Sequence, residues 1–189
     1  DLNNTGGDAM DGLQDWPMAG NHSDVAAQQC PPNMAKWLKK LDSKLLLIIN
    51  TIAEAGGGVW IVGGAPRDVM LGTDVSDIDL AVDLTPQKML TIFPDAIETG
   101  VEFGTLTLRG GDSMYQCTTL RTESQYIDGR RPQVVNWGTS LAQDLQRRDF
   151  TINAMAIDVS RMILHDPHNG ILDLERGVLR AVGHASLRL

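Results

Sequence analysis

Two aspartates separated by one residue, Asp77 and Asp79, have the type and spacing that suit metal-dependent chemistry. Side chains two apart in a strand point to the same face, so a strand over residues 78–82 would hold both carboxylates together near its start. Two such carboxylates repel each other unless a cation lies between them, and their hard oxygens suit Mg²⁺. A pair of ions held in this way would assist an in-line displacement at phosphorus. An Asp-x-Asp pattern on its own is more often a turn or a solvated strand end.

A glycine pair that precedes the aspartates offers a place for phosphate. Gly63 and Gly64 follow a short apolar run and precede a helical segment, so free backbone N–H groups and the positive end of a helix dipole would face an anion there. Arg67, one turn into that helix, adds charged donors. The alternative is a tight turn in which Arg67 pairs with Asp68. The phosphate interpretation gains weight because this cradle and the two carboxylates lie within one strand–helix–strand unit.

A second polar cluster follows a predicted helix, at residues 147–153. Arg147 and Arg148 provide fork-shaped donors for phosphate, and Asp149 and Asn153 provide polar groups for a ribose hydroxyl. The alternative, which is as good when the cluster is taken alone, is a solvated basic turn at a helix C-terminus.

The elements that would position these residues form an α+β pattern, a small mixed sheet flanked by helices. An apolar stripe predicts a single helix from Met34 to the glycines at 56–58. Apolar runs predict buried strands at 59–62 and 78–82, and glycine-bounded runs at 105–109 and 114–120 predict a hairpin. Shorter helices are predicted at 65–71, from Pro86 to Phe93 behind a Thr85 cap, and after Ser140, with a polar loop at 122–132.

Composition limits the class of protein. The chain of 189 residues is 42% apolar and 21% charged, which is typical of a globular domain, and no run approaches the length of a membrane helix. Two cysteines, Cys30 and Cys117, are too few for a disulfide framework or a zinc site, and their number fits a reducing compartment. We therefore expect an intracellular location, with the cytoplasm preferred and an organelle as the alternative. A net charge of −8 argues against a broad nucleic-acid surface. Residues 1–33 are acidic, lack Lys and Arg, and are predicted to be disordered.

Several spaced motifs resemble class II CCA-adding enzymes and bacterial poly(A) polymerases, which belong to the polymerase β-like nucleotidyltransferase superfamily. The sequence GGAPRD at residues 63–68 is followed by DIDLA at 77–81, and RRDFTINAM occupies 147–155. Further similar segments are TTLR at 118–121, DGRRP at 128–132, DPHNG at 166–170 and LRAVG at 179–183. The resemblance covers residues 59–189 and implies that 34–189 form the catalytic head domain.

The resemblance implies roles for individual residues. Asp77 and Asp79 would be the catalytic ligands of two Mg²⁺ ions, and the substrates would be CTP and ATP, added to the 3′ end of tRNA. Residues 122–132 fall where the family has a flexible loop that assists the switch from C to A addition. The nucleotide would contact the glycine pair and the polar side chains that follow: Gly63, Gly64, Arg67, Arg147, Arg148, Asp149 and Asn153.

The chain departs from the family pattern in two places. Gln116 stands where the family usually has an acidic residue, and an amide does not carry the charge of a general base or hard metal ligand. The chain also stops before the neck, whose Glu-Asp-x-x-Arg motif pairs with the incoming base, and before the body and tail that grip tRNA. We therefore interpret the chain as part of a longer protein whose nucleic-acid contacts lie mainly elsewhere.

The preferred hypothesis is the head of a template-independent enzyme that adds C and A to tRNA 3′ ends. The INAMA segment at 152–156 favours CCA-adding members over poly(A) polymerases, although a poly(A) polymerase or a CC- or A-adding specialist is the nearest alternative. A nucleotide-binding module that is inactive without its neck and body, and a scaffold domain whose Asp pair is only a solvated strand end, are the alternatives from other classes.

Overall fold

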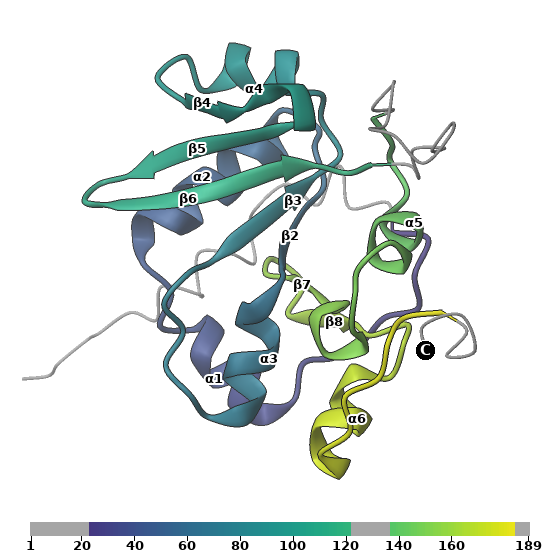
Figure 1. Ribbon diagram of the computed structural model, residues 1–189. Helices are drawn as coiled ribbons and strands as arrows, with labels where there is room; N and C mark the ends of the chain where they lie inside the picture. Colours follow the sequence, from purple (N-terminus) through teal and green to yellow (C-terminus); the bar gives the residue numbers. More distant parts are fainter. Residues whose placement is uncertain (1–22, 122–136, 184–189) are drawn as a thin grey trace, which may run out of the picture.

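One mixed sheet organises the part of the chain that the structure describes (Figure 1). The computed structural model describes residues 23–121 and 137–183. The strand order is β1-β8-β7-β2-β3-β6-β5-β4; β3 and β6 are parallel and the other neighbours are antiparallel. The strands are β1 (Gln28–Gln29), β2 (Val59–Val62), β3 (Asp79–Val82), β4 (Ile97–Gly100), β5 (Thr105–Gly110), β6 (Ser113–Thr119), β7 (Ala156–Asp158) and β8 (Ile163–His165).

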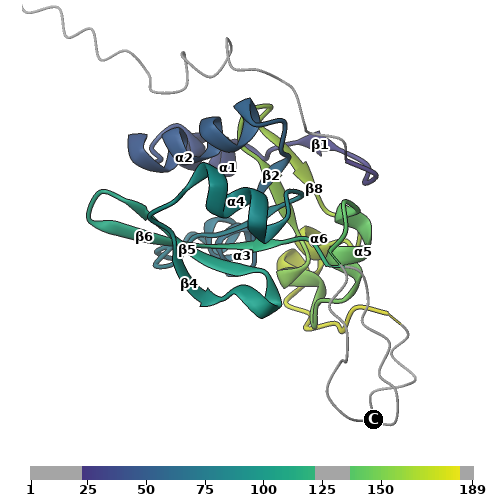
Figure 2. The same cartoon turned by 90° about the horizontal axis from the view of Figure 1, so that it is seen from above.

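Helices cover the two faces of this sheet unequally. They are α1 (Pro32–Leu38), α2 (Ser43–Glu54), α3 (Gly64–Leu71), α4 (Pro86–Ile92), α5 (Leu141–Gln146) and α6 (Gly170–Arg176). Residues of α1, α2, α3 and α4 contribute to the larger hydrophobic cluster on one face. The smaller cluster, on the other face, includes Leu141 and Leu145 of α5. Helix α5 lies apart from α1 and α2, on the opposite side of β2 and β8 (Figure 2). The predicted α+β fold, a mixed sheet flanked by helices, is confirmed.

All four residues of strand β2 are apolar because both of its faces are buried. Val59 and Ile61 belong to the larger cluster, while Trp60 and Val62 belong to the smaller one beneath α5. Successive side chains of a strand point to opposite faces, and here both faces are covered. The rigid strand therefore ends directly at the glycine pair.

The helix predicted from residue 34 to the glycines at 56–58 is wrong as a single element. The structure has α1 and α2 there, because Asp42 caps a new helix by accepting a hydrogen bond of 2.7 Å from the backbone N–H of Lys44. Both helices pack on the larger cluster, through Leu38 and Leu45 for example, so the apolar period continues across the break. Periodicity alone does not reveal such a break.

The predicted disorder of residues 1–33 is wrong at its C-terminal end. Strand β1 pairs with β8 at the edge of the sheet, and the Cys30 N–H donates to the Met162 carbonyl at 3.2 Å. Helix α1 then begins at Pro32 rather than residue 34. Backbone pairing at a sheet edge requires no hydrophobic period, so neither the pattern nor the composition of residues 1–33 indicates strand β1. Residues 1–22 lie outside the described residues.

The remaining predicted elements agree with the structure within a few residues. Gly72 ends α3 in the left-handed conformation, and the Thr85 and Ser140 side chains cap α4 and α5. Strands β5 and β6 form the predicted hairpin. The predicted loop at 122–132 lies outside the described residues, and β4, β7, β8 and α6 were not predicted. None of the described helices is long and apolar enough to cross a membrane.

Candidate active site

The two predicted catalytic aspartates line one cavity of about 460 Å³, together with Ile78, Thr107, Met114 and Gln116. Asp79 is the first residue of β3, and Asp77 lies in the segment just before it. Asp79 is half-buried, whereas Asp77 is exposed. The strand therefore holds one carboxylate firmly against the sheet and the preceding segment presents the other to solvent, at the same cavity.

The Asp79 carboxyl is in an environment that disfavours its charge. Burial, followed by the negative charge of Asp77, raises the pKa of Asp79, and the positive charge of Arg148 acts in the opposite direction. This geometry brings together the predicted carboxylate pair and one of the arginines from the second polar cluster. A cation between the carboxylates would relieve the conflict.

Gly63 allows the backbone to approach Asp79 closely. It has a φ of +75°, and a Cβ built on it would lie 3.2 Å from Asp79 Oδ2. Asp79 also pairs in register with Val62, the residue before the glycine. The start of α3, where the sequence predicts a phosphate cradle, is therefore adjacent to Asp79.

Arg67 joins the two polar clusters, which are far apart in the sequence. Its Nε donates to Asp68 Oδ1 at 3.0 Å, so the alternative pairing considered from sequence is present. Its Nη1 also donates to Asn153 Oδ1 at 2.7 Å, and the Asn153 amide in turn donates to Asp149 Oδ1 at 3.4 Å. The guanidinium lies over Gly64, where an added Cβ would be 2.9 Å from Arg67 Nη2.

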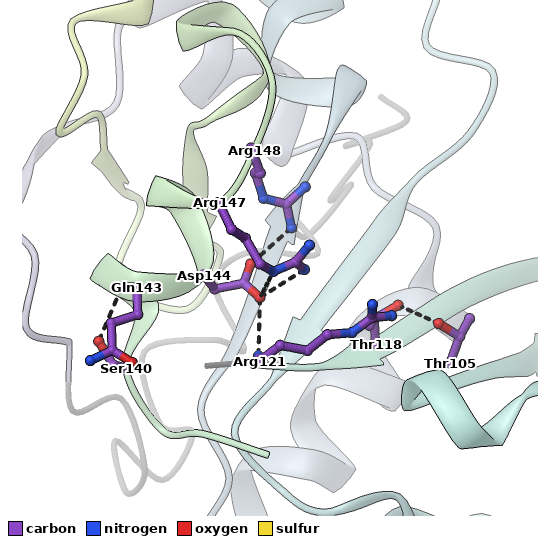
Figure 3. A network of polar contacts seen from close by, with 8 residues as sticks. All are labelled: Thr105, Thr118, Arg121, Ser140, Gln143, Asp144, Arg147 and Arg148. Atoms are coloured by element: carbon purple, nitrogen blue, oxygen red, sulfur yellow. Dashed lines mark hydrogen bonds and ion pairs between the residues drawn. The ribbon is translucent and has the colours of Figure 1, made fainter. Parts of the chain in front are cut away.

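Asp144, which was not predicted as a site residue, anchors the two remaining arginines (Figure 3). Its Oδ1 accepts from Nη2 of Arg147 at 2.9 Å and from Nε at 3.2 Å, and its Oδ2 accepts from Nη2 of Arg148 at 3.0 Å. Asp144 is buried, and both arginine side chains are partly exposed. The signal was available in the sequence, because a carboxylate three and four residues before two arginines on a helix faces both of them.

Arg121 is a second residue that sequence reasoning missed. Its backbone N–H donates to Asp144 Oδ1 at 3.2 Å, and it forms an antiparallel bridge with Trp137. Its side chain extends away from Asp144 in the direction of the Thr118 and Thr105 pair (Figure 3). Its pKa is lowered by burial and then by the charge of Arg147, with Arg148 adding to the effect and Asp144 opposing it.

Comparison with known proteins supports the resemblance seen in these motifs. The family described as the Poly A polymerase head domain matches residues 59–180. The chain belongs to this family. Curated CCA-adding enzymes from Streptococcus pneumoniae and Listeria monocytogenes are 45% and 41% identical to this head domain over 145 residues. Each match covers 77% of the chain, but only 36% and 37% of the relatives, so the chain spans about a third of their length.

Solved structures are similar to the head domain as well. A Bacillus stearothermophilus CCA-adding enzyme in complex with CTP is 34% identical with a TM-score of 0.66, covering 84% of this chain and 35% of that one. A Thermotoga maritima CCA-adding enzyme complexed with tRNA is 26% identical with a TM-score of 0.61, covering 83% and 36%. The predicted family and head-domain fold are thereby confirmed.

Gln116 occupies a defined place beside the carboxylates of this head domain. It pairs in register with Asp79 across the parallel β3–β6 edge and with Thr107 across the β5–β6 edge. It is exposed and lines the same cavity as both aspartates. The position next to Asp79 therefore carries a neutral amide rather than a third charge.

The donor set at this cavity fits Mg²⁺. Two carboxylates, an amide and the Thr107 hydroxyl offer hard oxygens, and the raised pKa of Asp79 shows that burial and Asp77 leave its charge poorly compensated. Among residues 23–121 and 137–183, no group of three or more His, Cys, Asp or Glu side chains is placed to hold a metal. Mg²⁺ commonly takes one or two carboxylates and completes its shell with water and substrate phosphates, and the two aspartates at this cavity match that number.

Proposed function

We propose that this head domain transfers nucleotides from CTP and ATP to the 3′ end of tRNA that lacks its CCA sequence. The observation that supports it best is the convergence of Asp77 and Asp79 on one cavity, with Gly63 against Asp79 and Arg148 close enough to act on its charge. The relatives named as CCA-adding enzymes favour this substrate over the poly(A) and single-nucleotide alternatives.

In this proposal each group has a separate task. Asp77 and Asp79 would hold two Mg²⁺ ions, which would neutralise charge at the reacting phosphate. The N–H groups at Gly63 and Gly64, together with Arg67, bind the triphosphate, and attack of the RNA 3′-hydroxyl on the α-phosphorus forms a phosphodiester and releases pyrophosphate.

The second polar cluster holds the rest of the nucleotide in this proposal. Arg148, with Arg147 beside it, contributes positive charge, and both are held by Asp144. Asn153 and Asp149 lie next to Arg67 and offer hydrogen bonds for a sugar hydroxyl. Because Arg67 is already paired with Asp68 and Asn153, we expect nucleotide binding to displace one of these contacts.

The test is incorporation of labelled CMP and AMP into tRNA lacking its 3′ CCA, with Mg²⁺, by the chain and by its Asp77→Ala variant. We expect the variant to lose at least about a hundredfold in rate, because a metal ligand supports several kcal/mol of transition-state stabilisation. Asp95→Ala is the matched control, since Asp95 is exposed and lies on the α4–β4 connection.

The outcomes separate the remaining hypotheses. Incorporation of A alone, or of C alone, would identify a specialist. Mg²⁺-dependent CTP binding that is lost in Asp77→Ala, without incorporation, would identify a nucleotide-binding module that is inactive in this form. Absence of CTP binding by the unmodified chain would refute the proposal.

A further inference from the structure

A cluster of side chains with an excess of positive charge lies beside the carboxylate cavity. The guanidinium groups of Arg147 and Arg148 and the backbone N–H of Arg121 all contact the buried carboxylate of Asp144, so these four residues carry more positive than negative charge. The pKa of Arg121 is lowered first by burial and then by the other two guanidinium groups, which indicates mutual repulsion. A cluster of this kind is stabilised by an anion, and phosphate matches the geometry of guanidinium donors.

Strand register connects this cluster to the catalytic carboxylates along one face of the sheet. Gln116 lies beside Asp79 and opposite Thr107; two residues further on, Thr118 lies opposite Thr105, and their hydroxyls are 3.0 Å apart. Side chains two apart share a face and are separated by roughly 7 Å along the strand. The face that carries Asp79 therefore includes the threonine pair. Arg121 follows the end of β6, and its side chain extends in the direction of this pair (Figure 3).

An exposed aromatic ring accompanies Arg121. Phe103 is 48% exposed, and the Arg121 guanidinium carbon lies 5.9 Å from the centre of its ring. Trp137, which bridges to Arg121, packs against Gly104, the neighbour of Phe103. A guanidinium beside an accessible aromatic face is a surface on which a nucleic-acid base can stack while its phosphate is bound.

The nucleoside triphosphate and the RNA 3′-hydroxyl would approach Asp79 from opposite sides. The glycine pair that would hold the triphosphate lies on the β2 side of Asp79, whereas Gln116, the threonine pair and Arg121 lie on the β6 side. In an in-line displacement the attacking and leaving oxygens lie on opposite sides of the phosphorus. If pyrophosphate leaves toward the glycine pair, the hydroxyl must arrive from the β6 side.

We propose that Phe103, Arg121 and the Thr105–Thr118 pair form the binding surface for the single-stranded 3′ end of the acceptor RNA. Arg121 binds a backbone phosphate, Phe103 stacks on a base, and the threonine hydroxyls line the path to the carboxylates. This inference rests on the proposed function, because it assigns the second substrate of the same site.

The test measures binding of a fluorescent RNA minihelix lacking its 3′ CCA, alongside binding of CTP with Mg²⁺, to the chain and to Arg121→Ala and Phe103→Ala. We expect RNA binding to weaken about tenfold in each variant, as for lost base stacking or phosphate contacts, with CTP binding unchanged. Arg121→Ala should also reduce the slope of log affinity against log salt by about one. Arg121→Lys, which keeps the charge but not the planar group, should give an intermediate loss.

Controls match each change in charge and size. Arg176→Ala removes a positive charge from the last turn of α6, and Leu47→Ala removes an exposed apolar side chain from α2. Neither should alter RNA binding. Weaker CTP binding with unchanged RNA binding would assign Arg121 to the nucleotide and overturn the inference, as would equal loss in the control variants or no RNA binding by the unmodified chain. All these results leave the proposed transferase function to be decided separately by Asp77→Ala.

Discussion

At the scale of single residues, two features of this site lower the stability of the folded protein. Asp79 is half-buried beside another carboxylate, and Gly63 with a positive φ leaves room for it. The buried charge is unfavourable in the protein alone, and the positive φ restricts position 63 to glycine. A bound cation would offset the charge, and the close backbone at Gly63 would leave room for a phosphate. Perturbed carboxylates that line a cavity are typical of functional sites.

Asp79→Asn should stabilise the protein while it removes activity. The folded-state pKa of Asp79 is raised, so its contribution to stability is greatest below the unfolded-state pKa and is lost as pH rises through the folded value. At pH 7 without divalent cations, the variant should therefore melt at a higher temperature than the unmodified chain. Thermal melts from pH 4 to 8 test this, and a lower melting temperature at pH 7 would contradict it.

Adding Mg²⁺ supplies the control for this prediction. A ligand that binds only the folded state raises the melting temperature. Mg²⁺ should raise that of the unmodified chain and have little effect on Asp79→Asn, so that the two values converge.

Asp144→Asn should weaken nucleotide binding without direct contact to the nucleotide. It removes the charge that holds Arg147 and Arg148, at 2.9 and 3.0 Å, while keeping the side-chain size. We expect the KM for CTP to rise by about tenfold, the cost of a charge-assisted hydrogen bond. Asp158→Asn changes another buried aspartate, at the end of β7, which lies near an arginine, Arg161. It should affect stability alone, and equal KM values in both variants would refute a positioning role for Asp144.

At the scale of elements, local signals were predictable and long-range pairings were not. Signals formed by residues adjacent in the sequence predicted four features that the structure has: the strand at 59–62, the caps at Thr85 and Ser140, and the β5–β6 hairpin. Strands β7 and β8 have three residues each, too few for a periodic signal, and β1 has two. The contact between Arg67 and Asn153 and the anchoring of Arg121 on Asp144 depend on how distant elements pack.

Gly104→Ala should destabilise the junction between β5 and the residues that follow 136. Gly104 has a φ of +78°, and a Cβ would lie 2.5 Å from Trp137 Cζ3. The left-handed backbone alone costs about 1 kcal/mol for alanine, and the clash adds about 1–3 kcal/mol. Urea unfolding measures the loss. Gly177→Ala is the control, because Gly177 has a φ of +64° with nothing within 4 Å, and an equal loss there would exclude the clash.

At the scale of the whole molecule, residues 23–30 connect the far edge of the sheet to the start of helix α5. Residues 26–30 run along β8. Asp24, just before them, accepts hydrogen bonds from the Ser140 hydroxyl at 2.5 Å and from the Ala142 N–H at 3.0 Å. Helix α5, which ends at the two arginines of the site, is thereby held at its start by residues from the other end of the chain.

Asp24→Asn should reduce stability at neutral pH but not in acid. Burial raises the pKa of Asp24, but the hydrogen bonds from Ser140 and Ala142 outweigh it, so the net pKa is lowered. Its contribution is therefore present above the unfolded-state pKa and is lost as pH falls through the folded value. The difference in unfolding free energy, at most about 1 kcal/mol as for a helix cap, should vanish in acid. A difference that persists below pH 3 would contradict this.

These contacts between residues far apart in the sequence have a consequence for synthesis on the ribosome. Asp24 is made 116 residues before its partner Ser140, and Arg67 is made 86 residues before its partner Asn153. Strand β1 cannot dock until β8 has been made. A nascent chain therefore carries its aspartate pair without Arg147, Arg148 and Asn153 until these residues have been made, and the first described segment to leave the ribosome is among the last to find its place.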